Sequence, residues 1–142
     1  MRLADWLKGF SRPDVTKRRE RYDTGDRTAV ETMLGALNDA DPAARKHAVM
    51  ALGDIGDARA AGPIITLLND GDDDVRLEAV VALGKIGDPV AVEPLIEKLK
   101  SYDYFYVRKK AAYTLYTFLK QERLDDGLRQ KIRAHWRSWY LT

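Results

Sequence analysis

Two stretches of the sequence decide the fold: DPAARKHAVMALGDIGD at residues 41–57 and DDDVRLEAVVALGKIGD at residues 72–88. They align without a gap at an offset of 31 residues (72 minus 41), and the residues that follow, Ala60, Pro63 and Leu68, recur at the same offset as Ala91, Pro94 and Leu99. A fixed period indicates stacked units, none of which buries its apolar face alone. The sequence therefore predicts a repeat architecture.

Each unit has the periodicity of short helices. The apolar positions of its first half fall on one helix face and do not alternate as in a strand; they are Ala48, Val49, Leu52 and Ile55. The register continues upstream through residues 25–37 and, with one inserted residue, downstream from Val107 to Leu115. We expect two complete units with a partial unit on each side.

Helix boundaries are marked by residue type. Gly56 suits the left-handed position that ends a helix, and Asp57 beside it suits the N-cap of the next one, which predicts a very tight turn. Asp41-Pro42 and Asp88-Pro89 read as N-caps with proline in the first turn. Gly53 and Gly84 lie inside the helical pattern, where glycine is unfavourable, and they predict a close approach of the next helix.

The pattern D-x-x-x-R-x-x-A-x-x-A-L-G-x-I-G-D, followed by A-x-x-P-[IL]-I, resembles the HEAT-like repeat named after phycobilisome lyase subunits. The resemblance is carried by residues 41–68 and 72–99 and, with the partial units, covers residues 23–120. It implies an all-α fold, an α-α superhelix of short antiparallel helix pairs. We expect residues 1–22 to be an N-terminal lead-in and cap, and residues 121–142 a C-terminal capping helix.

The resemblance also implies a structural role for the recurring arginines and aspartates. They are expected to form side-chain hydrogen bonds and caps between neighbouring units rather than to bind a ligand; they are Arg45, Arg76, Arg108, Asp26, Asp57 and Asp88. The repeat does not specify a function, because function depends on sites carried by a fold.

Composition excludes several classes of protein. The chain of 142 residues has no cysteine, which excludes disulfides, thiolate zinc sites and cysteine nucleophiles, and fits a cytoplasmic location. Nothing approaches the run of about 20 apolar residues that a membrane span requires. We expect a soluble protein without a membrane partner.

Catalytic patterns are missing as well. The two histidines, His47 and His135, are followed by Ala and Trp, so the His-Glu pairs that hold iron in deoxyhypusine hydroxylase, which resembles this architecture, do not occur. The acidic run Asp70–Asp74 lacks the alternating ligands of a calcium loop and reads as a turn with a spare N-cap. We expect no enzymatic activity, cofactor or metal; a lyase or lyase-associated role, suggested by the name of the repeat, is the outside alternative.

Charge and aromatic residues are unevenly distributed. Residues 23–100 carry eight Lys/Arg against fifteen Asp/Glu, whereas residues 1–22 carry seven against three and residues 101–142 nine against four. All thirteen aromatic residues lie outside residues 23–101. The favoured interpretation is that large rings cap the two ends of the stack; the alternative is that basic and aromatic ends bind phosphates.

These patterns leave two candidate surfaces. By the family resemblance, second helices line a concave face, whose partner-binding candidates are Glu31, Asn38, Thr66, Asn69, Glu93, Glu97 and Lys100. The basic and aromatic candidates for nucleic acid are Arg129, Lys131, Arg133, Arg137 and Trp139. We expect a non-enzymatic scaffold that binds another protein, with nucleic-acid binding as the second hypothesis.

Overall fold

The computed structural model describes residues 27–122 and 124–141. These residues form only helices and turns, with no strand among them. In chain order the elements are α3 (Arg27–Ala36), α4 (Pro42–Ile55), η1 (Ala58–Ala60), α5 (Ala61–Thr66), η2 (Leu67–Asn69), α6 (Asp73–Ile86), η3 (Pro89–Ala91), α7 (Val92–Lys100), α8 (Phe105–Leu119) and α9 (Asp126–Leu141). The all-α prediction is confirmed.

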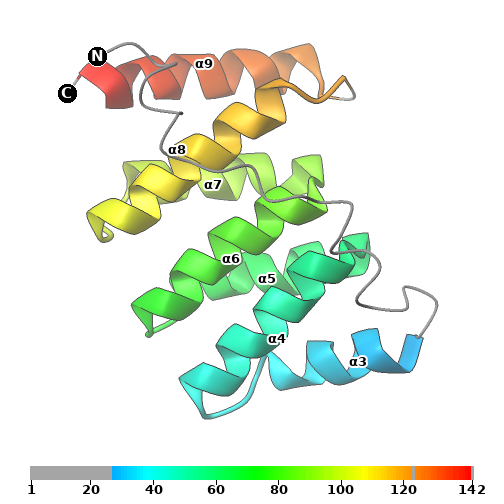
Figure 1. Ribbon diagram of the computed structural model, residues 1–142. Helices are drawn as coiled ribbons and strands as arrows, with labels where there is room; N and C mark the ends of the chain where they lie inside the picture. Colours follow the sequence, from blue (N-terminus) through cyan, green and yellow to red (C-terminus); the bar gives the residue numbers. More distant parts are fainter. Residues whose placement is uncertain (1–26, 123, 142) are drawn as a thin grey trace.

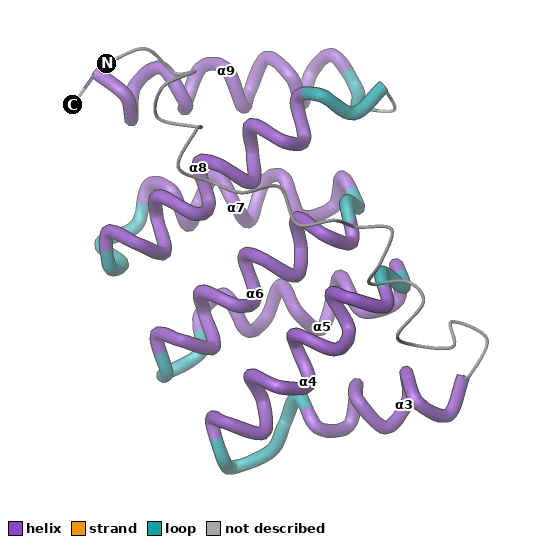
Figure 2. The backbone as a smooth tube through the Cα atoms, viewed as in Figure 1, coloured by secondary structure: helices purple, strands orange, loops and turns teal. Residues whose placement is uncertain are grey.

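The helices form two layers. Helices α4, α6 and α8 lie side by side in one layer, and α3, α5, α7 and α9 form the other (Figure 1). Contacts join neighbours along the stack: α4 packs on α6, α6 on α8, and α9 on both α7 and α8. The tube view shows the short turns that connect the layers (Figure 2). Within the described residues, no helix is both long enough and apolar enough to cross a bilayer.

The tight turn inside each complete unit is formed as the sequence predicts. Gly56 and Gly87 end α4 and α6 in the left-handed conformation, with φ of 75° and 71°. The next residues, Asp57 and Asp88, accept hydrogen bonds from the amides of Arg59 and Val90 and so cap η1 and η3. Glycine is favoured at this left-handed position because any Cβ would be strained there.

The turns between units also follow the sequence. Asp41 accepts a hydrogen bond from the Ala43 amide, and Pro42 occupies the first position of α4. Asp72 caps α6 by accepting from the Val75 amide at 3.0 Å. Both cap predictions are confirmed.

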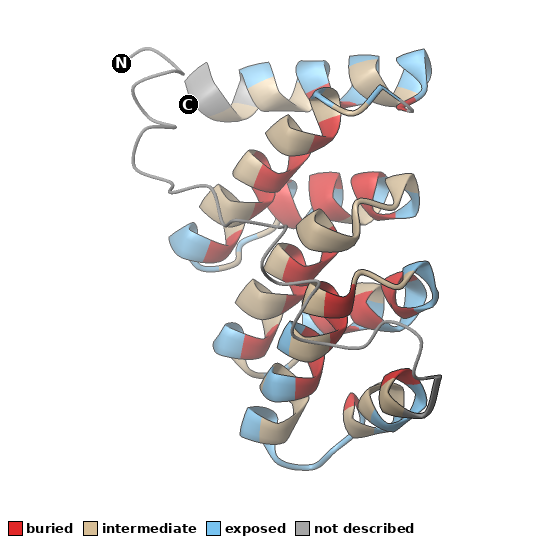
Figure 3. Cartoon of the chain, turned by 45° about the vertical axis from the view of Figure 1, so that its right-hand side comes forward, coloured by how far each residue is buried: buried red, intermediate tan, exposed pale blue. Residues whose placement is uncertain are grey.

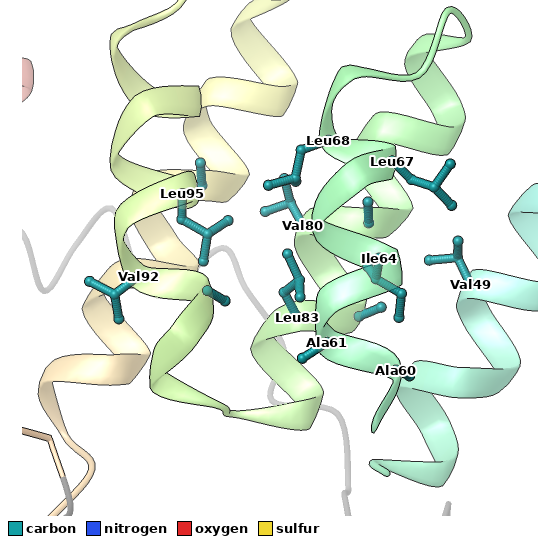
Figure 4. Close-up of a cluster of buried hydrophobic side chains, with 14 of the residues drawn as sticks. Val49, Ala60, Ala61, Ile64, Leu67, Leu68, Val80, Leu83, Val92 and Leu95 are labelled. Atoms are coloured by element: carbon teal, nitrogen blue, oxygen red, sulfur yellow. The ribbon is translucent and has the colours of Figure 1, made fainter. Parts of the chain in front are cut away.

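The core lies between the two layers (Figure 3). The predicted stripe of α4 is buried, and so are its counterparts in α6 except Ile86, which is partly buried. The buried residues Ile64 and Leu95 of the second layer belong to the same cluster (Figure 4). Apart from Phe118, every buried apolar residue in the described chain is Ala, Val, Leu or Ile. Val30 of α3 and Leu37 in the turn after it are buried, while Met33 is only partly covered.

Two helix glycines allow the first layer to close. A Cβ on Gly53 of α4 would lie 2.8 Å from the Ala82 Cβ and 2.9 Å from the Ala82 Cα of α6. A Cβ on Gly84 of α6 would lie 2.9 Å from the Thr114 Cγ2 of α8. The predicted close approach of the next helix is therefore confirmed at both positions.

Candidate interaction surfaces

An arginine of each complete unit binds the turn that follows that unit. The Arg45 guanidinium donates from Nε and Nη2 to the two carboxylate oxygens of Asp70, at 2.9 and 2.8 Å. Its Nη1 donates to the backbone carbonyls of Asp39 and Ala40. This geometry pairs two parallel N–H donors with one carboxylate, the strongest form of the interaction. Arg45 thus joins the turn before its own helix to the turn after its unit.

Arg76 repeats the arrangement one unit later. It donates from Nε and Nη2 to Asp103 at 2.9 and 3.0 Å, and from Nη1 to the Asp70 carbonyl at 2.8 Å. Lys98 adds a third contact to Asp103, at 3.0 Å. The third arginine, Arg108, differs because it donates to the carbonyl of Leu99 at 3.3 Å.

Two different sets of aspartates form the expected caps and the contacts with the arginines. Asp57 and Asp88 act as caps, while the arginines pair with Asp70 and Asp103. The sequence did not lead us to expect Asp70 and Asp103 as the partners of the arginines. Asp26 lies outside the described residues.

Electrostatics favour the ionised form of both partner carboxylates. The hydrogen bond from Arg45 lowers the pKa of Asp70 below its ordinary value, although burial opposes it. Burial is the largest influence on the pKa of Asp103 and would raise it, but hydrogen bonds from Arg76, Lys98 and the Tyr104 amide outweigh burial and leave this pKa lowered. The ion pairs therefore contribute stability above acidic pH.

A cavity of about 480 Å³ lies beside the ion pair between Arg76 and Asp103. Its lining residues are Asn69, Asp70, Arg76, Lys98, Ser101, Tyr102, Asp103 and Tyr104. The four charged groups in this lining already have partners of opposite charge. The cavity therefore offers tyrosine rings and neutral polar groups rather than an unpaired charge.

The seven candidates on the second-helix layer are all exposed. They come from α3, the turn after it, α5, η2 and α7, and they are Glu31, Asn38, Thr66, Asn69, Glu93, Glu97 and Lys100. We call these residues the second-helix surface. Lys100 pairs with Glu97 at 3.1 Å on the outside of α7.

The basic candidates on α9 are divided between internal and exposed roles. Arg129 is partly buried and donates to the carbonyl of Leu119, the last residue of α8, and to those of Gln121 and Leu124 in the turn after it. Lys131 pairs with Glu93 of α7. Arg133 and Arg137 are exposed. The structure therefore links α9 to the second-helix surface through Lys131.

Aromatic residues near the C-terminal end fall into two groups. Trp136 donates from Nε1 to the Ala112 carbonyl at 3.0 Å, and it packs with Trp139 against the core, as the capping interpretation expects. The rings that begin α8 behave differently. Tyr102, Tyr104, Phe105 and Tyr106 are 108, 65, 61 and 73% exposed, so they do not cap the stack.

The acidic run 70–74 has structural partners. Asp70 binds Arg45, Asp72 caps α6, and Asp74 lies 3.7 Å from Lys46. In the described part of the chain, no cluster of three or more His, Asp or Glu side chains is arranged to hold a metal ion.

Two stacked layers of short helix pairs, joined by repeated arginine-aspartate contacts, define an α-helical solenoid. A comparison with protein families matches the chain to the HEAT repeats at residues 21–63, 30–116 and 61–134. The chain belongs to the HEAT-repeat family. None of the curated proteins compared with the chain matches it significantly.

Proposed function

We propose that this chain is a protein-interaction module that binds its partner through the second-helix surface. The observation that carries the proposal is the exposure of all seven of its polar residues on a layer whose apolar side is buried. HEAT repeats generally serve protein-protein interaction, and the family is typically non-enzymatic. A preformed stack supports binding because less conformational freedom is lost on association.

The repeat type is part of the proposal. The offset of 31 residues between Arg45 and Arg76, and the A-L-G-x-I-G-D motif after each, favour the short repeat named after phycobilisome lyase subunits. We assign the chain the binding role of such repeats, without lyase chemistry.

Nucleic-acid binding is supported less well by the contacts of α9. Phosphate binding requires cations that remain available at the surface. Arg129 instead caps backbone carbonyls, and Lys131 is engaged with Glu93. Arg133 and Arg137 alone form a small footprint.

Affinity purification from the native host tests the proposed surface. The bait is the full chain, compared with a Glu93→Lys/Glu97→Lys variant and with Glu122→Lys, an exposed charge reversal between α8 and α9. We expect the proteins retained by the wild type to be lost from the double variant and kept by the Glu122 control.

A further control separates surface charge from helix packing. Because Glu93 pairs with Lys131, the exchange Glu93→Lys/Lys131→Glu reverses the charge at residue 93 while preserving an ion pair between α7 and α9. Loss of the partner in this exchange supports direct recognition of Glu93. An unchanged partner list for the double variant would show that another surface is used.

A further inference from the structure

The strongest unexplained feature is a group of exposed rings at the start of α8. Among the described residues, six large apolar side chains are exposed, and four of these lie within residues 102–106. Buried positions are available to other aromatic residues, such as Phe118, so their exposure is a property of this turn. Exposed apolar patches of this kind mark sites of interaction.

The rings lie on the edge where the turns between units meet. The starts of α4, α6 and α8 follow one another along one side of the stack (Figure 1). We call residues 39–41, 70–74 and 102–106 the turn edge. Asp70, Tyr102 and Tyr104 line one cavity, so the acidic second turn and the aromatic third turn are close neighbours.

Charge on the turn edge favours a cationic partner. The edge carries seven aspartates: Asp39, Asp41, Asp70, Asp72, Asp73, Asp74 and Asp103. The cations that pair with them are Arg45, Lys46, Arg76 and Lys98. With Arg108 and Lys109, which keep their charges at the start of α8, the aspartates still outnumber the cations by one (seven minus six). Arg108 is directed to the Leu99 carbonyl, and Lys109 lies over the Phe105 ring. Asp73 is exposed beside this group.

The rings themselves suit cations. Within the described chain, Lys109, Lys110 and Lys120 lie over the rings of Phe105, Tyr113 and Tyr116, at 6.0, 5.5 and 4.6 Å from the ring centres. The rings of Tyr102, Tyr104 and Tyr106 carry no such lysine from the described residues. A ring face next to a carboxylate attracts lysine and arginine side chains through the quadrupole and the charge together.

We propose that the turn edge is a second binding surface that takes an arginine- or lysine-rich protein segment. Basic side chains would lie on Tyr102, Tyr104 and Tyr106 and interact with the carboxylates of the neighbouring acidic turn. This inference rests on the proposed interaction function and adds the chemistry of a partner to it.

Fluorescence anisotropy of a labelled peptide of alternating arginine and glycine tests the proposal with the full chain. The arginine peptide is expected to bind, more weakly as salt rises, and its glutamate counterpart is expected not to bind. A Tyr102→Ser/Tyr106→Ser variant should bind about four- to twenty-fivefold more weakly, at about two- to fivefold for each exposed ring. A Glu122→Gln control, at an exposed residue outside both surfaces, should bind as the wild type does.

Besides a failure of the arginine peptide to bind, two results overturn the inference. One is that the wild type and the tyrosine variant bind the arginine peptide with equal affinity, because the tyrosine rings would then contribute nothing to binding. The other is a map of amide chemical-shift changes, measured with the same peptide, that lies outside residues 70–74 and 102–106. Thermal unfolding of the variant confirms that it is folded, because both side chains are exposed.

Different results would exclude the proposed function and this inference. If the tyrosine variant still retains the proteins captured by the wild type and the arginine peptide does not bind, only the turn edge is excluded. If the wild type itself retains no protein, the interaction function fails.

Discussion

Arg76 and Asp103 show how single side chains connect one helical unit to the next. Their side chains are 15 and 5% exposed, and two parallel hydrogen bonds join them. Arg59 and Asp57 form a similar contact, but the Arg59 side chain is 51% exposed and its partner is two residues away. Burial and sequence distance therefore separate a contact between units from a local one.

Removal of Arg76 is expected to destabilise the fold. An Arg76→Gln variant leaves Asp103 buried with Lys98 as its remaining cation and removes the bond to the Asp70 carbonyl. We expect a loss of about 2 kcal/mol in the free energy of unfolding, measured by urea titration. Arg59→Gln, the exposed control, should cause a smaller loss. Equal losses would contradict the structural role of Arg76.

Acid should weaken the same contacts. The pKa values of Asp70 and Asp103 are lowered in the folded chain, so their contribution is fully present above the unfolded value of about 3.9 and is lost as pH falls through the lowered folded value. We expect the free energy of unfolding to decrease below about pH 5. In Asp103→Asn this decrease should be shallower, although the variant is less stable at neutral pH. A wild-type slope in the variant would show that Asp103 is not a source of the acid sensitivity.

Helix elements are held at short distance by glycine and by paired side chains. Helices α4 and α6 meet at Gly53 and Ala82, and the ion pair between Asp54 and Lys85, at 2.8 Å, joins equivalent positions of the two units. The next contact, between α6 and α8, has Thr114 opposite Gly84. The same repeat position therefore serves two interfaces with different tolerance to an added methyl group.

Alanine substitutions should reveal this difference. In Gly53→Ala the new Cβ meets backbone and Cβ atoms of Ala82, so we expect a loss of about 1 to 3 kcal/mol despite the better helix propensity of alanine. Gly84→Ala meets a side-chain methyl of Thr114 and should lose less. Gly62→Ala, which has open space, should lose nothing. Chemical unfolding of the three variants measures the order, and a neutral Gly53→Ala would contradict the close approach.

Much of each element could be predicted from the sequence. The 31-residue offset, Gly56 with Asp57, and the stripe around Leu52 specify helices and turns through local physics. The pairing of Arg76 with Asp103 could not be predicted from the repeat. Asp70, the partner of Arg45, lies 33 residues before Asp103, whereas the repeat offset is 31 residues. The exposure of Tyr102 also could not be predicted, since a large ring suits both a cap and a surface.

The candidate surfaces were less predictable than the fold. Composition places Arg129 among the basic residues of the C-terminal end, yet the end of α8 and the turn after it supply three carbonyls to which its guanidinium donates. Lys131 is likewise joined to Glu93 by the packing of α9 on α7. Such contacts depend on which helices meet, which the one-dimensional pattern near the end of the stack does not specify.

As a whole molecule, the chain is a stack in which contacts join neighbouring units. Its stability is therefore expected to behave as a sum of units and interfaces. The inward side of each layer is used for this packing, and the second-helix surface and the turn edge remain outside it. Both surfaces run along several units, which is how solenoids build extended binding sites.

The mass of the native assembly tests the interaction function most directly. We would purify the tagged full chain from its host, treat it with nucleases, and measure the mass of the recovered particle by light scattering after gel filtration. We expect a particle heavier than the 16.1 kDa chain, with a second protein in fixed ratio. A 16.1 kDa monomer alone, or added mass that the nucleases remove, would contradict it.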